Sequence, residues 1–358
     1  MPNVFTNVNV ILWYRWIFRR KSHSKAVVLY FLSRRYGTSP RFFPLYNEFH
    51  RTDIVLFNGS RFPGFDRMYL KALPHFIRVF KWKLQKYPFF ISLNSDPSLT
   101  VRTNTILNLD DPTYKESEIL QLIAWEKAVA RLGYKSTIVC TTPYIENYLL
   151  SHEISSTIKI ISQGHSNSGS AGSRSDRKES SFVDFVYISP TIDVTGDPHE
   201  GHKMWDASTL LHEIWPLVEA PNARLHLIGR LGQKASLIQE DRRVITYGLL
   251  TIEECSKLLP KFQIALYPRI HDNAWLPQKL VEYLGAGLPV LAFDLTDTQI
   301  VQDLGIGLLV KSVQEFSLTI DRIATKKIDT DTFRSNCLNL SGSYTWHALA
   351  AKFESLYS

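Results

Sequence analysis

Short apolar runs alternate along the chain with longer segments in which apolar residues recur every three or four positions. The runs are rich in Val, Ile and Phe and show little polar alternation, as parallel strands buried on both faces should. Strands that alternate with helical segments predict right-handed crossovers and doubly wound sheets. In the first half we expect strands at 26–32, 53–59, 88–94, 104–110, 136–142 and 157–162, and helices over 66–87 and 115–134.

The second half repeats the alternation after an interruption. We expect strands at 182–189, 223–229, 242–248, 264–268, 288–293 and 307–312, and helices over 206–220, 251–262, 277–286, 297–304 and 344–358. The interruption, 167–181, has no large apolar residue and is dense in Ser, Gly and charge, which is typical of a linker or surface loop.

The expected organisation is two doubly wound α/β domains, a reasonable number for 358 residues. We expect an N-terminal domain at 1–166, the linker at 167–181, a C-terminal domain at 182–340, and a last helical segment, 341–358, that can cross back to the first domain. Ligands of such folds bind beyond the carboxyl ends of the strands, so a cleft between the two domains is the expected site.

A net charge of +7, from 41 Lys plus Arg against 34 Asp plus Glu, favours anionic partners such as phosphorylated substrates, nucleic acid or an anionic membrane. No apolar run reaches the roughly 20 residues that a membrane-spanning helix needs. Two interpretations of segment 8–25 stay open. It forms a helix on an anionic membrane surface, with Arg15, Arg19, Arg20 and Lys21 at the head groups, or an ordinary first helix whose basic end matches the helix dipole.

The three cysteines, Cys140, Cys255 and Cys337, fit no metal-binding spacing. We interpret them as buried thiols in a reducing compartment. The expected location is therefore the cytoplasm, with peripheral attachment at the inner membrane face as the consequence of the first interpretation of segment 8–25.

The segment 273–293, NAWLPQKLVEYLGAGLPVLAF, contains the most informative pattern. Pro277 suits the first turn of a helix and Gly287 suits its end. A helix over 277–286 places Lys279 and Glu282 at i and i+3 on neighbouring points of one face. Its apolar residues, Leu280, Val281 and Leu284, are expected to pack on a sheet.

The amino end of this helix has the chemistry of an anion site. No Ser, Thr, Asp or Asn precedes Pro277 to cap the free N–H groups, and Lys279 adds a full positive charge beside them. Glu282, one turn further, can accept hydrogen bonds from a vicinal diol such as a ribose. The alternative is a surface ion pair worth a few tenths of a kcal/mol.

The pattern P-x-K-L-x-E-Y-L-x-x-G-x-P-V-L-A resembles the nucleotide-diphosphate-sugar signature of GT-B glycosyltransferases, especially glycosyltransferase family 4 and bacterial polysaccharide-assembly enzymes. The resemblance extends over about residues 182–325. It implies a GT-B fold of two Rossmann-like domains that face each other across a cleft. The implied activity is transfer of a sugar from a nucleotide-diphosphate sugar to a saccharide or lipid-linked acceptor, in polysaccharide or glycoconjugate assembly.

Donor-binding roles follow from the same resemblance. Glu282 stands where the family holds the ribose, Arg230 and Lys279 where it holds the diphosphate, and Tyr247 and Gly248 where it borders the base. The other donor-binding candidates are Gln278, His271 and Asp272.

One position departs from the family pattern. Many retaining members carry a second glutamate eight positions before the clamp glutamate, and this chain has Ala274 there. Retention and inversion both stay open, and a catalytically inactive nucleotide-sugar-binding protein is the alternative function.

The chemistry needs a stabilised leaving diphosphate, which the cations and the helix terminus supply without a metal or other cofactor. In an inverting mechanism the catalytic candidates are Asp111 and Asp110, either of which can serve as general base. The alternative for this pair is a cap before Pro112. His165 is a third candidate that borders the sugar or merely packs. Acceptor-binding candidates are Gly59, Ser60, Arg61 and Asp96.

Two other classes are weaker. The positive charge suits a nucleic-acid-binding protein, but the charge is spread along the chain and no recognised motif is present. A dinucleotide-dependent dehydrogenase is disfavoured because no G-x-G-x-x-G follows an early strand.

Overall fold

The computed structural model describes the strands at 26–32, 52–58 and 89–93 by their backbone, and then residues 104–109, parts of 122–133, 135–152, 154–166, 181–194, 207–232, 241–271 and 276–357, together with Leu45 and Glu48. The chain divides into two compact units. Unit 1 comprises Met1–Ser162 and Trp346–Ser358, and unit 2 comprises Gln163–Thr345. The last helical segment therefore belongs to unit 1. The linker expected at 167–181 falls almost entirely outside the described residues.

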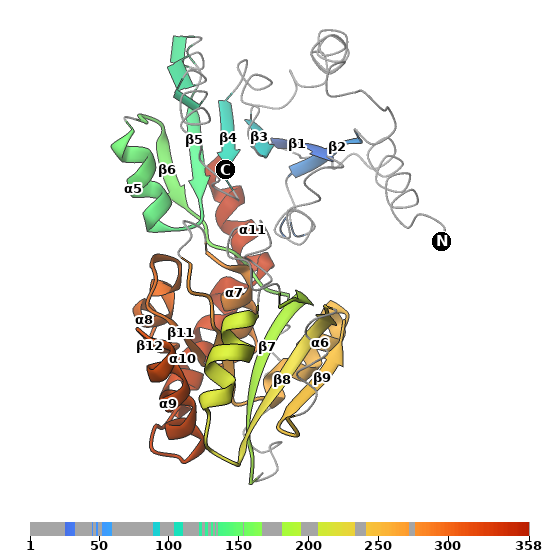
Figure 1. Ribbon diagram of the computed structural model, residues 1–358. Helices are drawn as coiled ribbons and strands as arrows, with labels where there is room; N and C mark the ends of the chain where they lie inside the picture. Colours follow the sequence, from blue (N-terminus) through green and yellow to red (C-terminus); the bar gives the residue numbers. More distant parts are fainter. Residues whose placement is uncertain are drawn as a thin grey trace. The chain divides into compact units, whose positions relative to one another are not determined.

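Unit 1 contains a six-stranded parallel sheet in the order β2-β1-β3-β4-β5-β6 (Figure 1). All six strands expected in the first half are found, several of them shorter than expected at the carboxyl end. They are β1 (Ala26–Leu32), β2 (Thr52–Asn58), β3 (Phe89–Leu93), β4 (Asn104–Asn108), β5 (Ser136–Cys140) and β6 (Thr157–Ile160).

The helices described in unit 1 are α5 (Pro143–Ser151) and α11 (Trp346–Glu354). The pattern over 115–134 is also helical wherever it is described, and it stops at Gly133, whose φ of 76° suits glycine. The sequence analysis did not predict α5, although its start signal is present. Thr142 caps the helix by accepting a hydrogen bond from the Ile145 amide at 3.3 Å, and Pro143 follows it.

Unit 2 contains a second parallel sheet, in the order β12-β11-β10-β7-β8-β9. Neighbouring strands β7, β8 and β9 are visible side by side in Figure 1. Because β7 is the first strand and β10 the fourth, the winding reverses direction between them, and ligands of doubly wound sheets bind at such a point. The strands are β7 (Val183–Ile192), β8 (Ala223–Leu231), β9 (Val244–Gly248), β10 (Ile264–Tyr267), β11 (Val290–Phe293) and β12 (Gly307–Val310).

The helices of unit 2 cover both faces of this sheet. The expected helices at 206–220, 251–262, 277–286 and 297–304 are present, the first as a π-helical segment Thr209–Ile214 followed by a 3₁₀ turn, Trp215–Leu217. The α-helices are α6 (Ile252–Leu258), α7 (Gln278–Gly285), α8 (Gln299–Asp303), α9 (Val313–Ala324) and α10 (Asp331–Ser341). The sequence analysis missed α9 and α10. Short 3₁₀ turns complete the unit at Leu259–Lys261, Thr296–Thr298 and Gly342–Tyr344.

Alternate residues of β7 pack into two hydrophobic cores, one on each face of the sheet. Phe185 and Tyr187 pack with the π-helical segment and α9, whereas Val186 and Ile188 pack with α6, α7 and α10. Burial on both faces explains why the strand reads as a nearly continuous apolar run.

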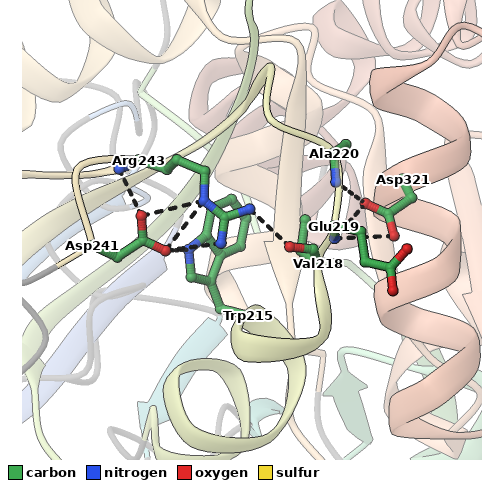
Figure 2. A network of polar contacts seen from close by, with 7 residues as sticks. All are labelled: Trp215, Val218, Glu219, Ala220, Asp241, Arg243 and Asp321. Carbon is green, nitrogen blue, oxygen red and sulfur yellow. Dashed lines mark hydrogen bonds and ion pairs between the residues drawn. The ribbon is translucent and has the colours of Figure 1, made fainter.

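A polar network ties the elements together at the amino ends of β8 and β9 (Figure 2). Arg243 binds Asp241 through Nε and Nη2 and donates from Nη1 to the Val218 carbonyl at 2.8 Å. Asp321, on α9, accepts from the Ala220 amide at 2.8 Å. These bonds satisfy backbone groups of the 218–220 turn. They fix this turn at the amino ends of the strands, opposite the carboxyl ends where ligands are expected.

All three cysteines are free thiols. Cys140 and Cys337 are buried as expected, whereas Cys255 is only half-buried on α6. No helix within the described ranges combines the length and apolar character needed to cross a membrane. The basic segment 8–25 lies outside the described residues.

Candidate functional site

The helix α7 begins beyond the carboxyl end of β10, at the point where the winding of the sheet reverses. Pro277 lies at the N-cap rather than inside the first turn, and no side chain caps the helix. The helix ends where expected, since Gly287 has φ of 68° and the Leu288 amide bonds back to the Tyr283 carbonyl at 2.9 Å. Its apolar face, Leu280, Val281 and Leu284, is 1% exposed at each position, which confirms the expected packing.

Tyr283 anchors α7 to the sheet. Strands β7 and β10 pair only at Ile264–Phe185 and Ala265–Val186. The next bond of that parallel ladder would join the Ile188 amide to the Leu266 carbonyl. The Tyr283 hydroxyl lies between these two groups instead, accepting from the Ile188 amide at 3.1 Å and donating to the Leu266 carbonyl at 3.5 Å. The phenol thus satisfies both groups at the position where the two strands diverge.

Lys279 lies in the first turn of α7 and is held by Tyr187 of β7. Its Nζ donates to the Tyr187 hydroxyl at 3.2 Å and lies 4.5 Å from the centre of the same ring. The phenol is 3% exposed, so the ring provides a fixed support beneath the ammonium. The lysine pattern was visible in the sequence, but Tyr187 was not singled out there.

Glu282 lies one turn further along α7. Its Oε1 accepts a hydrogen bond from Gln278 Nε2 at 3.0 Å, and burial raises its pKa to about 7 despite that bond. Burial first and the Glu282 charge second raise the pKa of the Cys255 thiol of α6. Lys279 is bonded to Tyr187 and forms no ion pair with Glu282 among the described residues.

Arg230 lies at the carboxyl end of β8, directly after Gly229. A Cβ on Gly229 would lie 1.9 Å from the Ser189 carbonyl oxygen, so only glycine permits this approach of β8 to β7. Arg230 is exposed, and within the part of the chain that the structure describes its guanidinium makes no hydrogen bond or ion pair. A cation in this state is available to an anionic ligand.

Tyr247 and Gly248 end β9. The Tyr247 hydroxyl bonds to His226 Nδ1 at 2.9 Å, and His226 Nε2 bonds to Asp184 Oδ1 at 2.9 Å. Burial opposes ionisation of Asp184, but the bonds from His226 and Arg224 hold its pKa below the usual range. Because the Tyr247 side chain is committed to this network, the residue can border a base through its backbone. Gly248 has φ of 70°, which turns the chain toward α6.

His165 lies in unit 2, at 1% exposure. Its Nε2 bonds to the Ser341 carbonyl at 2.9 Å, and its amide donates to the Tyr344 carbonyl at 3.0 Å. A Cβ on Gly285 would lie 2.3 Å from the imidazole Cγ, so the ring packs directly on the end of α7. Of the two alternatives for His165, the structure favours packing over contact with a sugar.

The remaining candidates divide into two groups. His271 lies half-buried in the loop between β10 and α7. Outside the described residues are Asp272 and Ala274 of the same loop, the catalytic candidates Asp110 and Asp111, and the acceptor candidates Gly59, Ser60, Arg61 and Asp96.

Among the described residues, no group of three or more His, Cys, Asp or Glu side chains is arranged so that it could hold a metal ion. The sequence Asp329-Thr330-Asp331 begins α10, and Asp329 Oδ1 accepts from the Asp331 amide at 2.9 Å. This aspartate therefore has a local structural role at the start of a helix.

Several solved structures share this fold at low sequence identity. Sucrose-phosphate synthase (tll1590) from Thermosynechococcus elongatus matches with a TM-score of 0.63 and 15% identity, over 93% of this chain and 98% of that chain. Anabaena Alr3699/HepE in complex with UDP and glucose matches with a TM-score of 0.63 and 13% identity, over 93% and 99%. WaaG, a glycosyltransferase involved in lipopolysaccharide biosynthesis, matches with a TM-score of 0.58 and 13% identity, over 93% and 99%.

These structures share the GT-B fold that the sequence resemblance implied, and the family model that matches part of unit 2 is one of glycosyltransferases. The matching family is described as Glycosyl transferases group 1, and the match covers residues 199–326, all within unit 2. No curated protein sequence matches the chain significantly.

Proposed function

We propose that this enzyme transfers a sugar from a nucleoside-diphosphate sugar to a saccharide or lipid-linked acceptor, in the assembly of a polysaccharide or glycoconjugate. The observation that carries the donor assignment is the first half of α7. It begins uncapped at the reversal point of the sheet and places an ammonium, a side-chain amide and a half-buried carboxylate within five residues.

Each donor group has a partner of matching chemistry in this proposal. Lys279, Arg230 and the amino end of α7 bind the diphosphate, because all three present positive charge or N–H donors. Glu282 accepts hydrogen bonds from the ribose hydroxyls. The backbone at Tyr247 and Gly248 borders the base, with His271 and Asp272 on the sugar side.

The reaction breaks the bond between the sugar and the diphosphate, so negative charge develops on the leaving group. Lys279 and Arg230 stabilise this charge, and the proposal therefore assigns no metal to the reaction. Asp111, with Asp110 as its neighbour, takes the proton of the attacking acceptor hydroxyl in an inverting reaction. The acceptor groups proposed are Gly59, Ser60, Arg61 and Asp96.

The proposal locates the reaction in the cytoplasm. Peripheral contact with an anionic membrane through the basic residues of segment 8–25 suits a lipid-linked acceptor. WaaG, whose name refers to lipopolysaccharide biosynthesis, supports this type of acceptor by fold likeness alone.

Thermal-shift assays with UDP, GDP, ADP and their sugars test the donor assignment. A ligand that binds the native state raises the melting temperature by mass action, so at least one nucleotide should stabilise the protein. Lys279→Met should lower the affinity for that nucleotide at least tenfold, because the variant loses a charge-assisted hydrogen bond to phosphate. Lys327→Met, which removes an exposed lysine after α9, is the matched control and should leave affinity unchanged.

Turnover separates the enzyme from a protein that only binds nucleotide sugars. Release of the nucleoside diphosphate from the stabilising sugar nucleotide, with EDTA present, is the expected result. A donor that binds tightly but is neither transferred nor hydrolysed favours the inactive alternative. Equal nucleotide affinity in the wild type and Lys279→Met would remove the donor assignment itself.

A further inference from the structure

The side chain of Gln278 makes two contacts that connect distant parts of unit 2. Its Nε2 donates to the Gly164 carbonyl at 2.5 Å and to Glu282 Oε1 at 3.0 Å. Gly164 lies 114 positions away in sequence, next to the start of unit 2, while Glu282 is four positions further along the same helix. The amide of Gln278 therefore links α7 to the first residues of unit 2.

The orientation of this amide is dictated by its surroundings. Both neighbours of Nε2 are acceptors, a carbonyl oxygen and a carboxylate oxygen, so only the NH₂ end of the side chain can face them. A flipped amide would place its oxygen against two other oxygens. The Oε1 atom is buried and has no hydrogen-bond partner within the described part of the chain. The fold thus leaves one buried acceptor unsatisfied while keeping the donor end in place, and such a group requires an explanation.

The task follows from what Gln278 does to Glu282. A carboxylate on a helix surface has several rotamers, and ordering it at the moment of binding reduces affinity. The bond from Gln278 selects one rotamer before a ligand arrives, and the second bond, to Gly164, prevents the amide itself from swinging away. The same bond favours the ionised form of Glu282, the form that accepts hydroxyl hydrogen bonds.

We propose that Gln278 is a positioning residue for the nucleotide ribose: its amide, anchored on the Gly164 carbonyl, holds the Glu282 carboxylate in the orientation that accepts the ribose hydroxyls. This inference rests on the proposed function. It assigns Gln278 a role through Glu282, whereas Lys279 and Arg230 act on the diphosphate.

Ribonucleotides and their dideoxy analogues distinguish positioning from general support of the fold. The probes are UDP, GDP and ADP and the matching 2′,3′-dideoxynucleoside diphosphates, titrated calorimetrically against the full chain. The wild type should bind its preferred ribonucleotide more tightly than the dideoxy analogue. Gln278→Leu should lose about tenfold in affinity for the ribonucleotide and almost nothing for the dideoxy analogue, because only the former contacts Glu282.

Gln299→Leu is the matched control. Gln299, on α8, also donates to a carboxylate and a backbone carbonyl, Asp294 Oδ1 at 2.7 Å and Leu295 at 3.3 Å, and is half-buried like Gln278. It should keep the full ribose preference. If Gln278→Leu does not fold, Gln278→Glu keeps the size of the side chain, replaces the donors by acceptors, and should lose the same preference.

The outcomes separate this inference from the proposed function. A wild type that prefers the ribonucleotide, with the preference unchanged in Gln278→Leu, overturns the inference alone. Equal losses for both nucleotides in Gln278→Leu also overturn it, because they indicate general damage to the site. A wild type that binds none of these nucleotides, or shows no ribose preference, overturns the proposed function and this inference with it.

Discussion

Lys279 and Glu282 are one helical turn apart, yet their surroundings differ in kind. The ammonium is held against the face and hydroxyl of Tyr187, a phenol 92 positions away in sequence. The carboxylate is half-buried and receives a hydrogen bond from Gln278. A surface ion pair, the alternative reading of this spacing, does not describe either group.

Burial of Glu282 makes the stability of the protein depend on pH. The pKa of this carboxyl is raised from 4.5 to about 7 in the folded state. Between these two values the folded chain binds more protons than the unfolded chain, so the free energy of unfolding decreases as pH rises through this window. Above pH 7 the charged glutamate destabilises the fold by at most about 3 kcal/mol.

Glu282→Gln should therefore raise the melting temperature at pH 8 and change it little at pH 4.5, because the amide stays neutral throughout. The same variant should bind a ribonucleotide more weakly, so the substitution should increase stability and reduce ligand binding. Thermal denaturation at both pH values measures the effect. Glu253→Gln, which alters an exposed carboxylate of α6, is the control and should show no such difference. If Glu282→Gln is no more stable than the wild type at pH 8, the ionised Glu282 carboxylate does not destabilise the fold.

At the scale of elements, α7 owes its position to the divergence of β7 and β10. The apolar face of α7 sets which side packs on the sheet, but many orientations of a helix satisfy that requirement. Tyr283 selects one of them, since its hydroxyl reaches the Ile188 amide and the Leu266 carbonyl at the end of the β7–β10 ladder.

Tyr283→Phe should lower the free energy of unfolding by about 1–3 kcal/mol, because it leaves a buried N–H and a buried carbonyl without their shared partner. It should also weaken nucleotide binding, as the first turn of α7 loses its register against β7. Chemical denaturation and calorimetric titration give the two quantities. Tyr344→Phe provides the comparison, since the half-buried Tyr344 hydroxyl makes no hydrogen bond among the described residues. Equal stability of the two variants would exclude the bridging role.

Strands were easier to predict than helices. All twelve expected strands are found. The clearest signal comes from β10 and β11, which are buried along their whole length and consist almost entirely of apolar residues. The helices α9 and α10 were missed, although Ser312 caps α9 by accepting from the Glu315 amide at 3.1 Å. The apolar residues of α9 also recur at helical spacing, so its signal was present in the sequence, whereas α10 is mostly polar and buries only Cys337 and Ser341.

At the scale of the whole molecule, the proposed function assigns donor binding and chemistry to different units. The proposed donor groups belong to unit 2, whereas Asp110 and Asp111 belong to unit 1. A defect in the proposed base should therefore leave nucleotide affinity intact. The net charge of +7 accords with a diphosphate substrate, although charge alone does not separate it from other anionic partners.

Asp111→Asn should lower turnover by at least a hundredfold, the usual contribution of a general base, with unchanged affinity for the donor nucleotide. Asp110→Asn is the neighbouring comparison and should retain more activity. Steady-state rates and nucleotide titrations on the same preparations provide the test. Full activity of Asp111→Asn would exclude it as the base, and equal losses in both variants would favour the cap that precedes Pro112.

The sequence by itself determined the two parallel sheets, the span and ends of α7, and the lysine and glutamate on it. These features depend on local periodicity, on the backbone preferences of Pro277 and Gly287, and on spacing along one helix. The tertiary structure alone decided which groups contact these and other side chains: Tyr187 contacts Lys279, Gly164 contacts Gln278, and Ser341 contacts His165. Such partners come from strands and turns tens of residues away, and only the folded chain brings them within hydrogen-bond distance.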